Sequence, residues 1–174
     1  MLKVANIMPF HLTRVFAFSL MLTPAYLYAE TFKQCNQHLD QLVNARKYKV
    51  AEYKGKFAKK MIMDHQTSYF RTHFRNTLAT DPKVELAGHY VVTAWGCGSP
   101  CYGLGWVDLK TGKAFMEPNY SYSIETSPDS QIIIKDRPES QAQIDITPWL
   151  TPTAYQLTAN GKFKKVYECK FDRK

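Results

Sequence analysis

The chain has 174 residues, of which 45% are hydrophobic and 22% are charged, and it shows no heptads, low-complexity tracts or internal repeats. These features exclude a coiled coil and a repeat protein and allow one domain with a core. The formal net charge of +8 favours acidic proteins, anionic lipid surfaces or nucleic acid as partners.

Residues 1–29 have the pattern of a secretory signal peptide. Lys3 and Arg14 precede the apolar run 15–22, Pro24 ends that run, and Ala29 is a small residue at which a signal peptidase would cut. The run is far shorter than the roughly 20 residues of a membrane span. We therefore expect cleavage after Ala29 and a periplasmic or secreted protein without an integral membrane span. An uncleaved anchor is the alternative.

Residues 30–174 are expected to form a single α+β domain that begins with helices. Thr31 and Gln34 have the spacing of a capping box. Apolar residues then recur with helical spacing, which puts Cys35 on a core-facing side. The segment 47–63 could contain strands, and Gly55 argues against one long helix there. Residues 67–79 are predicted to form a second helix. Three apolar residues share one face of that helix: Phe70, Phe74 and Leu78.

Beyond Asp81-Pro82 the sequence predicts an antiparallel β-meander on which the helices pack. The expected strands are residues 89–95, 102–109, 113–117, 121–126, 131–135, 154–157 and 162–171. Gly112 and Asn160-Gly161 are suited to hairpin turns. Residues 137–149 are polar and are expected to form an exposed excursion. In the last strand one face is predicted to carry Phe163, Tyr167, Cys169 and Phe171, interrupted by Lys165.

The four cysteines are predicted to form two disulfides, because their number is even and the chain is expected to be exported. Cys97 and Cys101 flank a short turn, which leaves Cys35 to pair with Cys169. A four-cysteine zinc site needs two close pairs, and a thioredoxin-type site needs two residues between its cysteines. Neither pattern occurs here.

Several short motifs follow one another along the middle of the chain. They are Ala87-Gly88-His89-Tyr90, Trp95-Gly96-Cys97-Gly98, Cys101, Asp108, Thr111-Gly112-Lys113 and Ser127-Pro128-Asp129-Ser130. In this order they resemble a family of small exported bacterial proteins with an AGHY…WGCG-x-x-C signature. The resemblance covers roughly residues 69–135, and Glu85-Leu86 departs from the Asn-Phe type of pair expected there. It implies location and a related fold, and it assigns no catalytic or binding residue.

His89 is the best single candidate for chemistry, since it is titratable and neighbours the cysteine loop. A thiolate partner would need a free cysteine, and Ser99 lacks the G-x-S-x-G context of a nucleophile. A hydrogen-bonded strand histidine is the commoner role. The remaining histidines considered form no H-x-x-x-H or H-x-H pair, so we predict no metal site and no cofactor. They are His38, His65 and His73.

Two groups of surface residues are candidates for binding. Most aromatic residues of the chain are expected to fill the core, and the alternative for Tyr120 and Tyr122 is exposure for stacking on sugar or protein. A lysine cluster is predicted either to steer an acidic partner or to form a solvated face. It consists of Lys54, Lys56, Lys59 and Lys60.

The function expected from these features is that of a non-enzymatic periplasmic binding protein. Its partner would be a protein or an anionic envelope component rather than nucleic acid, which export disfavours. One concrete version is an inhibitor or immunity protein against an enzyme that attacks the envelope. The alternative is a periplasmic hydrolase that uses His89 with a nearby carboxylate.

Overall fold

A computed structural model describes residues 30–79, 81–99 and 101–171; the predicted signal peptide lies outside these ranges. The elements in chain order are α1 (Phe32–Asn44), η1 (Arg46–Tyr48), α2 (His65–Ser68), α3 (Arg71–Ala79), β1 (Tyr90–Gly98), β2 (Cys101–Asp108), β3 (Ala114–Ser121), β4 (Ile124–Glu125), β5 (Ile132–Lys135), α4 (Gln141–Ile146), β6 (Thr153–Leu157) and β7 (Phe163–Glu168). The predicted α+β class, with early helices and antiparallel strands, is confirmed.

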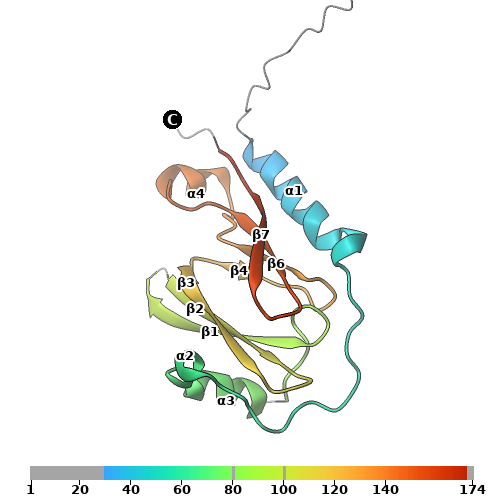
Figure 1. The fold of residues 1–174 in the computed structure, drawn as a ribbon. Coiled ribbons are helices and arrows are strands. Elements are labelled where there is room, and N and C mark those ends of the chain that lie inside the picture. The colour runs from blue at the N-terminus through green and yellow to red at the C-terminus, as the bar shows by residue number, and fades with distance from the viewer. Residues whose placement is uncertain (1–29, 80, 100, 172–174) are drawn as a thin grey trace, which may run out of the picture.

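The strands form two antiparallel sheets. The first has the order β1-β2-β3 and the second the order β4-β5-β6-β7. In Figure 1, α1 lies beside the second sheet, and α2 and α3 lie against the outer side of the first. Successive side chains of a strand point to opposite faces of its sheet, so β5 packs against two neighbours. Ile132 and Ile134 pack with α1, whereas Ile133 faces the first sheet.

Three clusters of buried residues hold these layers together. The α1 core joins α1 to the second sheet and contains Cys35, Leu39, Tyr48, Ile132, Ile134, Ala154 and Cys169. The α3 core joins α3 to the first sheet and contains Phe74, Val84, Val91, Trp95, Val107, Leu109 and Ala114. The inter-sheet core contains Leu86, Ala87, Tyr90, Leu104, Trp106, Ile133 and Leu157.

The prediction that Phe163, Tyr167, Cys169 and Phe171 share one face of the last strand is wrong, because β7 contains a β-bulge. Tyr155 pairs with Lys165 but Ala154 pairs with Tyr167, so Val166 is an extra residue in β7. An extra residue shifts the alternation of side chains by one position. Phe163 therefore packs in the inter-sheet core, whereas Tyr167 packs against the α1 core.

The two predicted helices have different outcomes. The capping box of α1 is present, because the Thr31 side chain accepts from the Gln34 backbone and the Gln34 side chain accepts from the Thr31 backbone. The single helix predicted over 67–79 is wrong: α2 ends at Ser68 and α3 starts at Arg71. Between them, the amides of Tyr69 and Phe70 bond three residues back, which tightens the chain into a turn.

Two connecting segments also differ from their predictions. The segment 47–63 is irregular apart from the end of η1 and isolated bridges at Lys49 and Ile62. The predicted exposed excursion 137–149 contains α4, in which Ile144 is buried and Ile146 is exposed; Trp149, beyond the helix, is also exposed. Contacts with residues distant in sequence determine the conformation of these segments, so local sequence patterns did not predict it.

Both predicted disulfides are present. Cys35 of α1 joins Cys169, which directly follows β7, across a sequence separation of 134. Cys97 of β1 joins Cys101, the first residue of β2, across a separation of four. The respective Cα–Cα distances are 5.6 and 5.3 Å, which suit a disulfide.

None of the helices within the described ranges combines the length and the hydropathy that a membrane crossing requires.

Candidate functional site

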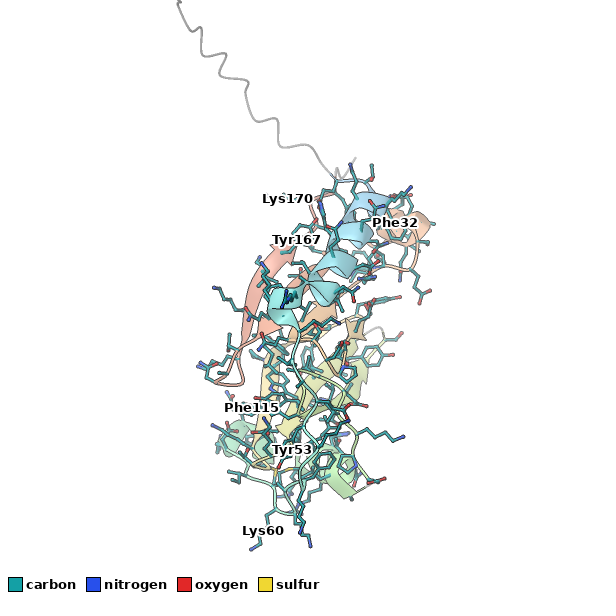
Figure 2. The ribbon with its side chains drawn as sticks, turned by 90° about the vertical axis from the view of Figure 1, so that its right-hand side faces the viewer. Phe32, Tyr53, Lys60, Phe115, Tyr167 and Lys170 are labelled. Atoms are coloured by element: carbon teal, nitrogen blue, oxygen red, sulfur yellow. A yellow bond between two sulfur atoms is a disulfide. The ribbon has the colours of Figure 1, made fainter. Side chains whose placement is uncertain are left out.

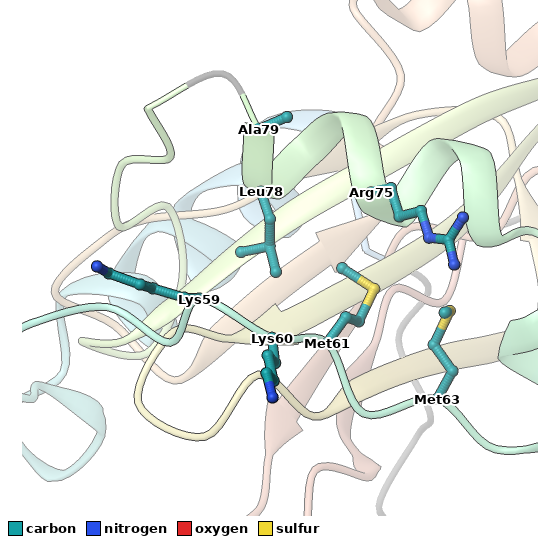
Figure 3. A pocket seen from close by; sticks show the side chains of 7 residues that line it. All are labelled: Lys59, Lys60, Met61, Met63, Arg75, Leu78 and Ala79. Atoms are coloured by element: carbon teal, nitrogen blue, oxygen red, sulfur yellow. The ribbon is translucent and has the colours of Figure 1, made fainter.

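A cavity of about 430 Å³ lies between α3 and the segment before α2. We call it the basic cavity. It is lined by Lys59, Lys60, Met61, Met63, Arg75, Leu78 and Ala79. Figure 3 shows the two methionines and Leu78 between the helix and the extended segment, with Arg75 above them. The cavity therefore combines an apolar lining with three cationic side chains.

The extended segment is held in place by the first sheet. The Ala58 amide donates to the Leu109 carbonyl at 2.8 Å, and the Ile62 amide donates to the Gly112 carbonyl at 2.8 Å. Gly112 has φ of 79°, and a Cβ there would overlap the carbonyl oxygen of Lys60. The glycine turn predicted between β2 and β3 thus also lets the lysine segment approach the sheet.

The opposite wall is α3, which is fixed by an aromatic stack. Phe74 is fully buried in the α3 core, and its ring lies where a Cβ at position 105 would otherwise be, so Gly105 of β2 permits this close approach. Phe70 stacks on Trp95 with ring centroids 4.5 Å apart. Arg75 follows Phe74 in the helix, so the packing of Phe74 places its neighbour at the cavity.

The cations of the basic cavity are not neutralised by neighbouring acids. Lys59, Lys60 and Arg75 have no ion pair with any residue in the described ranges. Of the other predicted lysines, Lys54 pairs with Glu52 at 2.7 Å, and Lys56 is exposed outside the cavity lining. The structure therefore places two of the four predicted lysines, which are adjacent in sequence, at the basic cavity, and their side chains point in different directions (Figure 3).

Arg75 is the member of this site that sequence reasoning missed. The helical pattern places it off the apolar face, but no motif connects residue 75 with Lys59 and Lys60. That connection depends on the irregular segment 58–63, whose course is set by backbone hydrogen bonds to the β2–β3 turn and to the first residue of β3. The available signal was the concentration of basic residues alone.

His89 lies near a carboxylate, as the hydrolase alternative requires. Its Nε2 is 3.9 Å from Oδ1 of Asp108, which is an ion-pair distance but too long for a hydrogen bond. Asp108 is already used in the turn, where its oxygens accept from the Lys110 amide and the Thr111 hydroxyl. Burial, followed by the charge of Lys110, lowers the pKa of His89, and Asp108 opposes this in part.

The two tyrosines named as binding candidates have different environments. Tyr120 is exposed, at 60%. Tyr122 is half-buried, and its hydroxyl accepts a 2.8 Å hydrogen bond from Nε2 of Gln143. Tyr122 is therefore partly committed to the junction with α4.

No group of three or more histidine, cysteine, aspartate or glutamate side chains in the described part of the chain could hold a metal ion. Comparisons with family models, curated proteins and solved structures find no match for the chain. The resemblance to the exported AGHY…WGCG-x-x-C family therefore stays a prediction.

Proposed function

We propose that the protein is an exported, non-enzymatic binding protein that holds an acidic partner at the basic cavity. The observation that carries this proposal is the set of three cationic side chains, Lys59, Lys60 and Arg75, around an apolar lining. None of them pairs with an acid in the described residues. Cations left unpaired beside apolar surface can be matched by an incoming anion.

The chemistry of the cavity specifies what the partner must present. Carboxylates would pair with the lysine ammonium groups as point charges and with the guanidinium of Arg75 in a bidentate geometry. Met61, Met63 and Leu78 would accept an apolar side chain, and methionine adapts its shape to such contacts. Without Lys3 and Arg14, which leave with residues 1–29, the 23 basic residues fall to 21 against 15 acidic ones, and this net charge of +6 would attract an acidic surface over a longer range.

Export is supported by the two disulfides. All four cysteines are paired, and structural disulfides persist in oxidising compartments. We propose cleavage after Ala29, so that the periplasmic protein begins at Glu30. Intact-mass measurement of periplasmic material should then show the loss of residues 1–29. A full-length, membrane-bound product would contradict this part of the proposal.

Within this class, an inhibitor or immunity protein against an envelope-targeting enzyme is our concrete proposal. Such a protein needs a compact, disulfide-bonded domain and a charged surface that is complementary to its target, and it needs no catalytic residues. The hydrolase alternative is less well supported, because His89 and Asp108 form no hydrogen bond and Asp108 already serves a turn.

The test is charge reversal with a matched control. Lys59→Glu/Lys60→Glu should abolish capture of the partner from envelope extract, or slow its association about tenfold or more at low salt. The difference should shrink at high salt, because ions screen the attraction. Lys164→Glu/Lys170→Glu makes the same charge change elsewhere, and Figure 2 shows Lys60 and Lys170 at opposite ends of the molecule.

The control variant should bind as the unmodified protein does. Equal weakening by both variants would show that net charge alone matters. An unchanged association rate in the cavity variant would show that Lys59 and Lys60 are solvated surface residues that do not contact the partner. If the captured material is anionic lipid rather than protein, the inhibitor version is wrong while the basic cavity stands.

A further inference from the structure

A second cavity of about 430 Å³ lies where the end of the first sheet meets the start of the second. We call it the tyrosine cavity. It is lined by Ala94, Tyr102, Tyr122, Ser123, Ile124 and Glu139. Its residues come from β1, β2, the β3–β4 link, β4 and the segment before α4. Its lining within the described ranges contains no lysine or arginine, so it differs in charge from the basic cavity.

One wall is fixed by the short disulfide. Tyr102 directly follows Cys101, whose bridge to Cys97 closes the end of the β1–β2 hairpin. On its other side, Tyr102 is paired with Ser121 of β3. The Cys97–Cys101 disulfide therefore restrains Tyr102, which lines the cavity, and so helps to preorganise the site.

The other wall is fixed by hydrogen bonds to the segment around α4. The Tyr122 amide donates to Oδ1 of Asp136 at 2.6 Å, and its hydroxyl accepts from Gln143. The Ser123 hydroxyl donates to the Arg137 carbonyl at 3.2 Å. These bonds hold the Tyr122–Ser123 backbone and use the Ser123 hydroxyl as a donor, so its oxygen can still accept a hydrogen bond from a ligand.

Two polar groups at the cavity have no partner among the residues that the structure describes. The Tyr102 hydroxyl and the Glu139 carboxylate make no hydrogen bond or ion pair with any residue that the structure describes. Tyr102 is 46% exposed, so part of its ring is open to solvent. The cavity thus offers an aromatic surface, a carboxylate and hydroxyl groups close together.

We propose that the tyrosine cavity binds a neutral saccharide. A sugar ring presents C–H groups that pack on aromatic side chains and hydroxyls that donate to carboxylates, which matches Tyr102, Tyr122 and Glu139. An anionic ligand would meet Glu139 with no nearby cation in the lining. A cationic ligand would be opposed by the net positive charge of residues 30–174, which have 21 basic and 15 acidic side chains once Lys3 and Arg14 are subtracted from the 23 basic residues of the chain. A neutral polyhydroxylated ligand meets neither obstacle.

The experiment uses defined probes: the N-acetylglucosamine tetramer, maltotetraose and, as a cation, tetramethylammonium. Titration followed by amide chemical-shift changes should show saturable binding of at least one oligosaccharide, with Kd about 1 mM or tighter. The shifts should centre on residues 94, 102, 122–124 and 139.

Substitutions at Tyr102 separate ring contact from hydrogen bonding. Tyr102→Ala should weaken binding about tenfold, whereas Tyr102→Phe keeps the ring and should lose less. Tyr69→Ala is the matched control, because Tyr69 is 73% exposed between α2 and α3. It should bind as the unmodified protein does. Amide spectra of each variant show whether the fold is retained.

Three results would overturn the proposal. These are saturation by neither oligosaccharide, unchanged affinity in a folded Tyr102→Ala variant, and binding of tetramethylammonium alone. The site is independent of the proposed function, so Lys59→Glu/Lys60→Glu should leave saccharide binding unchanged. Tyr102→Ala should in turn leave capture of the acidic partner unchanged, which separates failure of one proposal from failure of the other.

Discussion

The α1 core and the α3 core have the same form, a helix packed on the outer face of a sheet, but they are secured differently. The α1 core joins the first helix to the last strands and contains the fully buried Cys35, bridged to Cys169. The α3 core contains no disulfide. It relies on Phe70 and Phe74 packed around Trp95, with His73 stacked on the same indole at 5.4 Å.

The difference follows from the distance along the chain. Elements separated by 134 residues lose much conformational entropy on meeting, and a covalent bridge reduces that loss by constraining the unfolded chain. The helix α3 and the strand β1 are neighbours in sequence and need no such bridge. The basic cavity lies against the unbridged core, so its geometry depends on side-chain packing and on the backbone hydrogen bonds of the segment 58–63, with no covalent bridge.

The largest effect is expected from removing the long bridge. Cys35→Ala/Cys169→Ala should lower the free energy of unfolding by about 5 kcal/mol, and the control Cys97→Ala/Cys101→Ala by about 2 kcal/mol, since the chain-entropy effect grows with loop length. Typical total stability is about 5–15 kcal/mol. Urea denaturation without reductant measures both. Equal losses would show that the short bridge carries more than loop entropy.

The unbridged core should be most sensitive to a lost aromatic ring. Phe74→Ala should lower the free energy of unfolding by about 3–5 kcal/mol, because it leaves a cavity between α3 and Gly105. Phe74→Leu is the control and should lose less. If the basic cavity depends on this packing, Phe74→Ala should also weaken partner capture while the α1 core, followed by protection of its amides from exchange, stays intact. Capture as strong as in the unmodified protein would show that the two are independent.

The smallest effect concerns the start of α1 and depends on pH. The Glu30 carboxylate accepts from the Tyr167 hydroxyl and from Nδ1 of His38, the latter at 2.7 Å. Burial raises the pKa of Glu30, but hydrogen bonds from Tyr167, His38 and the Lys170 amide outweigh it and lower the pKa below 4.5. A lowered folded pKa stabilises the fold above pH 4.5, and this contribution is lost as pH falls through the folded pKa.

Glu30→Gln should therefore be less stable than the unmodified protein at neutral pH, and the two should converge in acid. Thermal unfolding between pH 7 and pH 2 checks this. Glu52→Gln, in an exposed pair with Lys54, is the control and should show little difference at any pH. A constant difference for Glu30→Gln down to the lowest pH would show that shape, rather than charge, matters at this position.

The features that the sequence predicted well are those that depend on residues close together in the chain. The capping box of α1 needs only Thr31 and Gln34, and Gly112 and Gly161 have the positive φ expected of their turns. The disulfide pairing followed from one short spacing and elimination. Each of these depends on a few neighbouring residues or on a simple count.

The features that sequence did not reveal depend on distant contacts. No local pattern divides the predicted meander into two sheets, and the bulge at Val166 is defined only by its pairing with β6. The lysine cluster was visible as a run, but its junction with Arg75 required the path of residues 58–63. Tyr102 was passed over because the sequence marks it only as a strand residue beside a cysteine.

The long bridge also bears on the order in which the molecule assembles. During synthesis, Cys35 appears 134 residues before its partner, while Cys97 meets Cys101 after four. The first sheet and its hairpin are complete while α1 still has no second sheet to pack on. Until Cys169 emerges, Cys35 has no native partner, and any bridge that it forms with Cys97 or Cys101 must be exchanged. We therefore expect the disulfide that secures α1 to form after the Cys97–Cys101 bridge.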